Sequence, residues 1–288
     1  MHKVLVTGAS GFIGKALCSF LEQSNYEVIK FTRKIGEITD EDTWKSLEKT
    51  DFVIHLAALN FVPESWKQSS EFLETNIVGT SRALEYAKRQ QAKMIYVSAY
   101  LYGIPKELPI TESHPILPNN PYALSKYLSE EVCKFHANFF NQSVTILRLF
   151  NVYGPGQRSE FLIPSLINQC LKSNVIKVLD LYPKRDYVFI DDVLDAIHRC
   201  MNQMNGLQIY NIGSSVSYSV EEMIEIIQKV CGTALKVNSE NVIRQNEIND
   251  VVADISRARD SLGWEPKFGI EQGISKIVQA EKKALGLI

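Results

Sequence analysis

Two side chains that could transfer a proton lie one helical turn apart in this sequence. Tyr122 and Lys126 open a predicted helix just after Pro121, and residues four apart share one helix face. An ammonium close to a phenol favours the phenolate, so we expect Lys126 to lower the pKa of Tyr122 and make it a usable acid and base. Ser98 ends the apolar run from Met94, where its hydroxyl could bind a substrate oxygen that Tyr122 protonates.

A tyrosine four residues before a lysine is also common on ordinary amphipathic helices, and a glycine-rich turn supplies the missing context. The stretch from Thr7 to Gly14 follows the apolar run Val4 to Val6 and opens an amphipathic run. Gly8 permits a tight turn, Gly11 lets the backbone approach a pyrophosphate, and Gly14 lets a helix pack close to the strand. Strand, glycine turn and helix place unpaired N–H groups against phosphates, which predicts a dinucleotide site.

The elements that must position these residues alternate along the chain. Apolar runs separated by helical patterns predict strands buried on both faces, and therefore an α/β fold with a Rossmann-type doubly wound parallel sheet. Predicted strands are Glu27 to Thr32, Phe52 to Leu56, Met94 to Ser98, Val144 to Leu149 and Leu207 to Ile212. Predicted helices are Asp40 to Lys49, Phe72 to Arg89, Tyr122 to Phe140 and Asp192 to Met201.

The remaining segments carry more turn formers and shorter amphipathic pieces. We predict a dinucleotide-binding domain over residues 1–154, to which 191–213 return. Residues 155–190 and 214–288 are predicted to form a smaller, mixed α/β C-terminal lobe that binds substrate. A cleft between two lobes is a usual place for a ligand.

Composition excludes several classes of function. A formal net charge of -2 over 288 residues argues against bulk electrostatic binding to nucleic acid or to an anionic membrane. The five cysteines are widely spaced, which fits reduced thiols better than disulfides or a metal site. No apolar run reaches membrane-spanning length, so we expect a cytoplasmic protein with a small-molecule ligand and no metal.

Further short motifs follow in order along nearly the whole chain. They are Asp51 to Ala58, Asn76 with Gly79-Thr80, Val97-Ser98 with Leu101-Tyr102-Gly103, Arg148 to Pro155, Arg185-Asp186-Tyr187, Asn211-Ile212-Gly213 and Leu262-Gly263-Trp264. Together with the glycine turn, Tyr122 and Lys126, this set resembles the extended short-chain dehydrogenase/reductases, a family of nucleotide-sugar epimerases, dehydratases and reductases.

The resemblance implies a role for each matching residue. Tyr122 would be the acid and base, Lys126 would bind the nicotinamide ribose and tune the tyrosine, and Ser98 would contact the reacting hydroxyl. The residues implied in cofactor binding are Gly8, Ser10, Gly11, Phe12, Ile13, Gly14, Arg33, Glu37, Ile38, Leu56, Ala57, Ala58, Asn76, Tyr122 and Lys126. A packing role fits Asn76 equally well, and His55, inside an apolar strand, is interpreted as structural.

The resemblance also implies a nucleotide-diphosphate sugar as the substrate. Arginine offers a planar, permanently charged fork to a diphosphate. Arg185 matches a family position that often meets the substrate diphosphate, and Arg244 resembles a second such arginine, with a solvated surface arginine as its alternative. Asn151 resembles an asparagine that binds substrate phosphate or sugar.

Two departures from common family patterns narrow the reaction. Ser98 is followed by Ala99-Tyr100, whereas family dehydratases usually carry an aspartate and a glutamate there, so water elimination is disfavoured. After the second strand, Thr32-Arg33 stands where an NAD enzyme usually offers an acidic residue to the ribose. Arg33, aided by Lys34, could pair with a 2′-phosphate, which favours NADP(H) over NAD(H); the alternative is an arginine that only faces water.

The leading hypothesis is an NADP(H)-dependent reductase of a nucleotide-linked 4-keto sugar, with hydride from nicotinamide and a proton from Tyr122. The alternative is an NAD-dependent nucleotide-sugar 4-epimerase, and a hypothesis of another class is a non-catalytic dinucleotide-binding regulator. We expect a homodimer through the helices Phe72 to Arg89 and Tyr122 to Phe140, as in the family. Apolar residues beyond one buried face support it, although burial within the monomer would also explain them: Ile77, Leu84, Leu128, Val132 and Phe139.

Overall fold

A computed structural model describes residues 1–242 and 247–286 of the chain. Its strands are β1 (Lys3–Thr7), β2 (Glu27–Phe31), β3 (Phe52–His55), β4 (Lys93–Ala99), β5 (Val144–Leu149), β6 (Asn151–Tyr153), β7 (Val175–Val178), β8 (Lys184–Phe189), β9 (Leu207–Ile212), β10 (Ser217–Ser219) and β11 (Lys236–Ser239). Its helices are α1 (Phe12–Gln23), α2 (Glu41–Lys45), α3 (Val62–Ser65), α4 (Ser69–Leu73), the π-helical η1 (Glu74–Val78), α5 (Gly79–Gln90), α6 (Pro121–Phe140), α7 (Leu162–Lys172), α8 (Ile190–Gln203), α9 (Val220–Cys231), α10 (Ser256–Leu262) and α11 (Ile270–Ala284).

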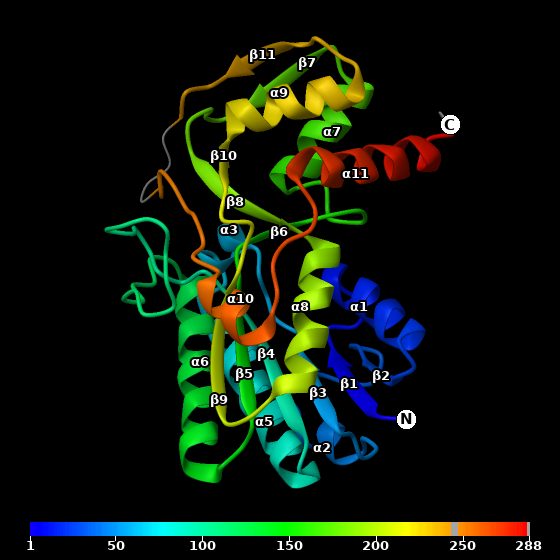
Figure 1. The fold of residues 1–288 in the computed structure, drawn as a ribbon, viewed down its shortest axis with the longest axis vertical. Coiled ribbons are helices and arrows are strands. Elements are labelled where there is room, and N and C mark those ends of the chain that lie inside the picture. The colour runs from blue at the N-terminus through cyan, green and yellow to red at the C-terminus, as the bar shows by residue number, and fades with distance from the viewer. Residues whose placement is uncertain (243–246, 287–288) are drawn as a thin grey trace.

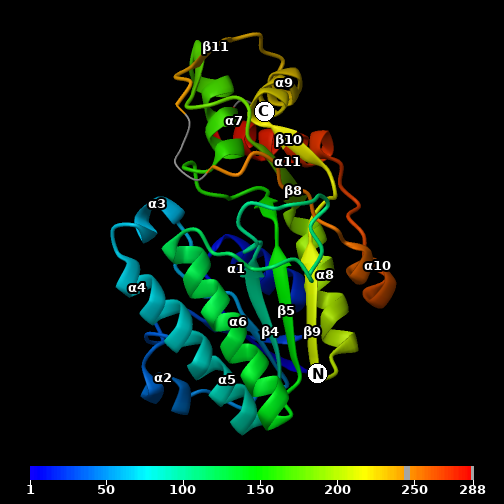
Figure 2. The same cartoon turned by 90° about the vertical axis from the view of Figure 1, so that its left-hand side faces the viewer.

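A six-stranded sheet forms the larger part of the molecule (Figure 1). Its order is β2-β1-β3-β4-β5-β9, and every neighbouring pair is parallel. Along β1, Val4 and Val6 are buried in one hydrophobic cluster and Leu5 in another, because alternate side chains face opposite sides of a strand. Figure 2 shows α4, α5 and α6 along one face, while α1 and α8 cover the other. The predicted doubly wound sheet is confirmed.

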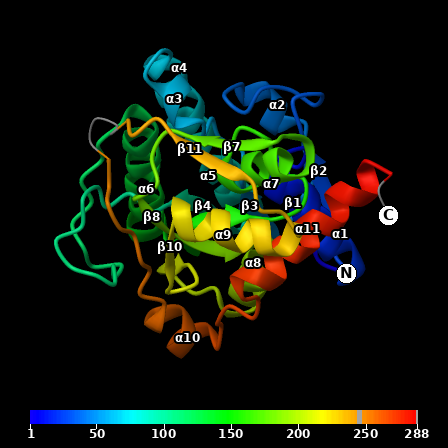
Figure 3. The ribbon, with the colours of Figure 1, turned by 90° about the horizontal axis from the view of Figure 1, so that it is seen from above.

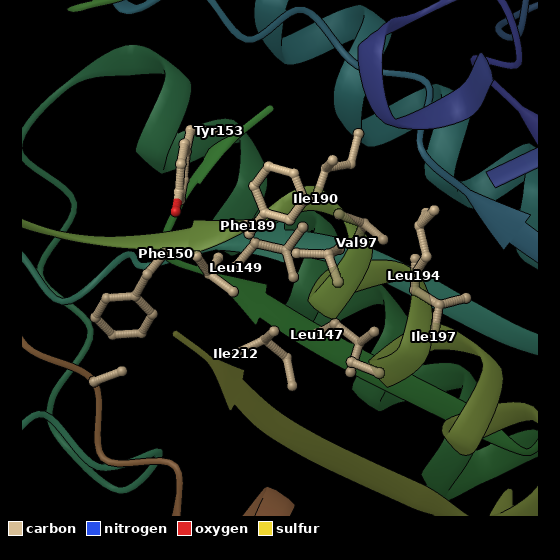
Figure 4. Close-up of a cluster of buried hydrophobic side chains, with 14 of the residues drawn as sticks. Val97, Leu147, Leu149, Phe150, Tyr153, Phe189, Ile190, Leu194, Ile197 and Ile212 are labelled. Atoms are coloured by element: carbon tan, nitrogen blue, oxygen red, sulfur yellow. The ribbon is translucent and has the colours of Figure 1, made fainter. Parts of the chain in front are cut away.

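The core beneath α8 joins the sheet to the rest of the chain (Figure 4). Strands β4, β5 and β9 contribute Val97, Leu147 and Ile212, which lie opposite Ile190 and Leu194 of α8. Each of these side chains is buried, so α8 and the sheet pack together without a gap as far as the carboxyl ends of the strands. This is the edge at which open α/β sheets bind ligands.

A smaller, mixed α/β lobe lies above that edge (Figures 1 and 3). We call it the C-terminal lobe; it consists of β6, α7, β7, β8, β10, α9, β11 and α11. Strand β8 pairs in parallel with β6 and antiparallel with β10, and β7 pairs in parallel with β11. Two elements cross the predicted boundaries: β6, from the first segment, pairs with β8, and α10, from the last, packs on β9 and α8. The exact division into domains stays a prediction.

Two predicted helices differ from the structure. The helix predicted from Asp40 to Lys49 covers only Glu41–Lys45, with Asp40 as its N-cap through bonds from two backbone N–H groups. The helix predicted from Phe72 to Arg89 comprises α4, η1 and α5, because a π-helical turn interrupts it around Asn76. Among the described residues, no helix is both long and apolar enough to cross a membrane.

Candidate active site

The glycine turn between β1 and α1 has the close backbone packing that its sequence predicts. Gly8 adopts a positive φ of 67°, and a Cβ there would lie 2.9 Å from the backbone nitrogen of Ala57. A Cβ on Gly14 would lie 2.1 Å from the carbonyl oxygen of Gly8. Gly11 is the N-cap of α1, which has no side-chain cap and no acidic residue in its first turn. The N–H groups at this helix end therefore remain available to an anion.

Thr7 ties the glycine turn to the segment that follows β3. Its Oγ1 accepts hydrogen bonds from the backbone N–H groups of Leu56 and Ala57, both at 3.1 Å. Because these two bonds occupy the lone pairs of Oγ1, the single hydroxyl proton of Thr7 is donated to His55 Nδ1, 2.8 Å away. Burial lowers the pKa of His55 to about 3, so the ring is neutral and serves this hydrogen bond. Predicted cofactor residues from β1 and β3 thus lie together at the topological switch point of the sheet.

Asn76 fastens the same segment to α6. Its side-chain amide donates to Leu59 O at 3.0 Å and to Ser125 Oγ at 2.8 Å, and its Oδ1 accepts from Leu59 N at 2.9 Å. The side chain is buried and its polar atoms are used inside the protein. These contacts support the packing interpretation of Asn76, which positions neighbours of Ala57 and Ala58.

Arg33 is exposed just beyond β2, beside the glycine turn. The turn holds the end of β2 through a hydrogen bond from Ala9 N to Phe31 O at 3.3 Å. No residue that the structure describes forms an ion pair with Arg33. The loop then leads into α2, whose Trp44 Nε1 donates to Ile38 O at 2.8 Å. Glu37 is exposed and Ile38 is half-buried next to it, so these three predicted residues lie on one loop.

Lys126 is buried and points into the end of the sheet. Its Nζ donates to Val97 O at 2.6 Å and lies 4.3 Å from the centre of the Tyr96 ring. Burial lowers the pKa of Lys126 to about 7. The neighbouring Ser98 is 4% exposed, and its Oγ has no hydrogen-bond partner among the described residues. The structure therefore brings Lys126 and Ser98 to the same point at the carboxyl end of β4.

Tyr122 lies one turn before Lys126, at the N-terminus of α6. Asn120 caps this helix by accepting from Ala123 N at 2.8 Å. The expected lowering of the Tyr122 pKa is wrong for this structure, because burial and the adjacent Tyr100 raise it. The ammonium of Lys126 is bound to a backbone carbonyl and is itself destabilised by burial, so it does not drive Tyr122 toward the phenolate. At neutral pH, Tyr122 is a protonated phenol.

The predicted substrate residues lie in or beside the C-terminal lobe. Asn151 donates to Asp186 O at 3.1 Å and accepts from the Tyr100 hydroxyl at 3.4 Å, which places it beside the active-site tyrosines. Arg185 forms an ion pair with Glu247 and donates to Ile248 O at 2.6 Å. Arg244 lies outside the described residues.

A buried network, to which the sequence motifs assigned no role, anchors α6 under the site. Arg148 of β5 donates from Nε and Nη2 to the carboxylate of Glu130 on α6, at 3.0 and 2.7 Å. Its Nη1 donates to the Tyr102 hydroxyl at 2.9 Å, which donates to Asn211 Oδ1 at 2.6 Å. Tyr102, Arg148 and Asn211 lie in the motifs quoted above, and Glu130 does not. The one sequence signal for Glu130 is its position four residues after Lys126 and eight after Tyr122, which places it along the same side of the helix.

The residues present fit a dinucleotide. The uncapped end of α1 suits the pyrophosphate, the Arg33 loop suits the adenosine ribose, and Lys126 with Ser98 suits the nicotinamide end. No carboxylate stands in the first turn of α1 to repel phosphate.

Comparison with known proteins agrees with this geometry. Residues 4–213 match the model of the NAD dependent epimerase/dehydratase family. The chain belongs to this family. Within it, the chain is 30% identical to a GDP-6-deoxy-D-mannose reductase from Pseudomonas aeruginosa, covering 96% of both chains. It is 32% identical to a putative UDP-glucose 4-epimerase from Methanocaldococcus jannaschii, covering 96% of this chain and 97% of the other.

Two solved structures match the chain over nearly its whole length. RMD from Pseudomonas aeruginosa, complexed with NADPH, matches with a TM-score of 0.91 and 29% identity, covering 99% of this chain and 100% of the other. A UDP-glucose 4-epimerase from Thermotoga maritima, with UDP-glucose, also has a TM-score of 0.91, with 27% identity and coverage of 98% and 99%. As a member of the extended short-chain dehydrogenase/reductases, this protein is an enzyme, and the non-catalytic regulator is set aside.

Proposed function

We propose that this enzyme is an NADP(H)-dependent reductase of a nucleotide-linked 4-keto sugar. The observation that carries the proposal is Arg33, an exposed arginine without an ion pair among the described residues, beside the glycine turn. A guanidinium there can pair with a 2′-phosphate, whereas the carboxylate usual in NAD enzymes would repel it. The similarity to RMD from Pseudomonas aeruginosa, which was solved in complex with NADPH, supports the same choice.

The residues around Tyr122 suit reduction of a carbonyl. The bound cofactor would supply hydride from its nicotinamide ring. Tyr122 keeps its proton at neutral pH, because burial raises its pKa, and can donate it to the oxygen of the reacting carbon. The Ser98 hydroxyl, with no partner in the described structure, can hold that oxygen in place. The hydrogen bond to Val97 O fixes Lys126 against β4, where its ammonium can bind the nicotinamide ribose.

The C-terminal lobe would hold the nucleotide diphosphate. Arg185 is oriented there by Ile248 O and by Glu247, so a diphosphate must share or displace that ion pair to reach the guanidinium. Asn151 lies between Tyr100 and β8, where it can contact the sugar or its phosphate. Arg244 is proposed as the second cation for the diphosphate. We also propose that the enzyme acts in the cytoplasm as a homodimer.

A nucleotide-sugar 4-epimerase is the second candidate, supported by the similarity to UDP-glucose 4-epimerases. Redox stoichiometry separates the two. We would incubate the enzyme with NADPH and a GDP- or dTDP-linked 4-keto-6-deoxyhexose, and follow cofactor oxidation and sugar product together. A reductase consumes one NADPH for each sugar reduced. Interconversion of UDP-glucose and UDP-galactose without net NADPH consumption would instead establish the epimerase and overturn the proposal.

A further inference from the structure

A buried carboxylate lies behind Arg185 in the C-terminal lobe. Asp186 belongs to β8, the central strand of the sheet β10-β8-β6 (Figure 1). Because side chains alternate across a strand, Asp186 faces the opposite side of this sheet from Arg185 and Tyr187. The Asp186 side chain is fully buried, whereas both neighbours are partly exposed. An enclosed carboxylate does not contact a ligand, so its charge must serve contacts within the protein.

The carboxylate of Asp186 joins β8 to segments that are distant in the sequence. Its Oδ1 accepts hydrogen bonds from Ser214 N at 2.6 Å and from Ser214 Oγ at 2.8 Å. Its Oδ2 accepts from Ser215 N and from Ala253 N, both at 3.0 Å. Both oxygens are acceptors, as in an ionised carboxylate. Among the described residues, N–H and O–H dipoles rather than a cation hold this charge.

The surroundings of the carboxylate are closely packed. A Cβ on Gly213 would lie 2.8 Å from Asp186 Oδ2 and 2.5 Å from Ala253 Cβ. Ser215 adopts a positive φ of 61°, which residues other than glycine rarely adopt. Its hydrogen bond to the carboxylate holds the backbone in this conformation. We call Asp186, Gly213, Ser214, Ser215 and Ala253 the Asp186 cluster.

The Asp186 cluster holds one end of the segment that orients Arg185. Arg185 Nη1 donates to Ile248 O at 2.6 Å, and Nη2 pairs with Glu247. Segment 247–253 therefore runs from the groups that hold the guanidinium to the Ala253 N–H group that Asp186 binds. Because the segment is fixed at both ends on β8, a displacement of Ala253 would move Ile248 O and the guanidinium with it.

The backbone of Asp186 orients a second residue of the site. Asn151 of β6 lies opposite Tyr187 and donates from Nδ2 to Asp186 O at 3.1 Å. The other end of the same amide accepts from the Tyr100 hydroxyl at 3.4 Å. The position of β8 at Asp186 thus sets the direction in which Asn151 faces the active-site tyrosines.

We propose that Asp186 is a positioning residue for the nucleotide sugar, because it fixes Arg185 and Asn151 without touching the ligand. This inference rests on the proposed function, in which Arg185 binds the diphosphate and Asn151 binds the sugar or its phosphate. A guanidinium fork binds phosphate oxygens only in a narrow range of directions. A displacement of about 1 Å at Ile248 O is enough to misdirect it.

The test measures ligand affinity by calorimetry on the full-length enzyme saturated with NADPH. UDP-glucose and GDP-mannose are the probes, and the reduced cofactor cannot oxidise either sugar during the titration. For the probe that the wild type binds more tightly, Asp186→Asn should weaken affinity by about tenfold to a hundredfold. NADPH affinity should stay unchanged, because the glycine turn is intact. Should Asp186→Asn fail to fold, Ser214→Ala removes only one hydroxyl and should weaken the probe by about twofold to tenfold.

Asp192→Asn is the matched control for a purely structural role. Asp192 of α8 is also a buried carboxylate, and it accepts from Lys267 N at 2.9 Å and from Phe268 N at 3.2 Å. Both variants should lower the midpoint of thermal unfolding, but only Asp186→Asn should weaken the probe. Equal weakening in both variants would leave Asp186 a stability role alone and overturn the proposal.

A double variant tests whether Asp186 acts through Arg185. Asp186→Asn combined with Arg185→Ala should weaken the probe by less than the product of the two single effects, because both changes remove one function. The full product would show independent effects and overturn the proposal. If Arg185→Ala weakens the probe but Asp186→Asn does not, this inference alone is wrong. If Arg185→Ala binds the probe as the wild type does, the proposed diphosphate site is wrong and the inference falls with it.

Discussion

The Tyr122 phenol carries the proton-transfer role, and its replacement tests that role directly. Tyr122→Phe keeps the ring that packs at the start of α6 but removes the transferable proton. We expect turnover to fall by about a hundredfold to ten-thousandfold, while NADPH affinity by calorimetry stays near that of the wild type. Turnover within a factor of two of the wild type would assign the proton to another residue.

Lys126 should destabilise the fold while it serves the site. Its pKa in the folded protein is about 7, against 10.5 for an ordinary lysine, so between these pH values the unfolded chain binds more protons. Wild-type stability should therefore rise from pH 7 to about 10 and be independent of this group below pH 7. Lys126→Met should lose turnover but gain about 2 to 4 kcal/mol in free energy of unfolding near pH 8.

Denaturant unfolding across this pH range checks the Lys126 prediction. The matched control is Lys88→Met, an exposed lysine of α5 whose replacement should leave the pH dependence unchanged. Parallel stability profiles for wild type and Lys126→Met would mean that the ammonium is solvated in the folded protein.

Arg33 is the residue on which cofactor selection depends. An exposed charge-assisted bond to the 2′-phosphate should contribute about 1.5 to 3 kcal/mol, or roughly tenfold to a hundredfold in affinity. Arg33→Ala should weaken NADPH by this factor, and less at high salt. NADH serves as the internal control, since it has no 2′-phosphate and its affinity should not change. Equal affinity of the wild type for NADH and NADPH would favour the epimerase.

At the scale of elements, the Glu130–Arg148 ion pair holds α6 against β5. Both side chains are enclosed, with exposures of 0% and 2%, so Glu130→Gln leaves a buried cation without its counter-charge. We expect a loss of about 3 to 5 kcal/mol in the free energy of urea unfolding. An exposed ion pair gives the control: Glu265 pairs with Arg259 at 3.6 Å, and Glu265→Gln should cost about 0.5 kcal/mol or less.

The outcome of the double variant separates charge from shape. Replacing Glu130 by Leu and Arg148 by Met together should recover most of the lost stability, because well-packed apolar groups can replace a buried pair. Equal losses in the single and double variants would show that the network stabilises α6 through shape rather than through charge.

The sequence predicted elements well where periodicity and turn residues agreed. Strands β1, β3, β4, β5 and β9 were each predicted within two residues, because buried parallel strands are continuous apolar runs. The prediction of one continuous helix from Phe72 to Arg89 was wrong at Asn76. Three hydrogen bonds of the Asn76 side chain accompany a π-helical turn there, and the local sequence pattern does not indicate that turn. The prediction that Lys126 lowers the pKa of Tyr122 was wrong for a similar reason. The burial of Tyr122 and the hydrogen bond from Lys126 to Val97 both depend on the folded sheet.

For the whole molecule, the sheet and its ligand edge could be predicted, but the mixed C-terminal lobe could not be traced strand by strand. Its strands β6, β7, β10 and β11 are only three or four residues long and pair with partners distant in sequence. The ion pair between Arg185 and Glu247 depends on this pairing, which explains why spacing alone did not indicate it.

The proposed homodimer is the prediction that concerns the whole molecule. An apolar groove of about 510 Å³ lies between η1, α5 and α6, lined by Ile77, Ser81, Leu128, Glu131, Val132, Phe135 and His136. Farther along α6, Phe139 is 72% exposed, whereas Leu84, which we expected to contribute, is fully buried inside the monomer. A second copy is the occupant we propose, because the groove continues into the exposed rings of Phe135 and Phe139, whose centroids lie 4.8 Å apart, and a two-fold arrangement would bury this apolar face against itself.

Light scattering at micromolar concentration should give twice the mass of one chain. Phe135→Glu places a charge in the groove and should prevent the dimer from forming. The variant should still fold as a monomer, because about half of the Phe135 side chain is exposed in a single chain, so the fold of that chain does not depend on burying it. Val216→Glu, at an exposed apolar residue near β10, is the matched control and should remain dimeric. A wild type that elutes and scatters as a monomer would remove the dimer, and a dimer that persists in Phe135→Glu would place the interface on another face.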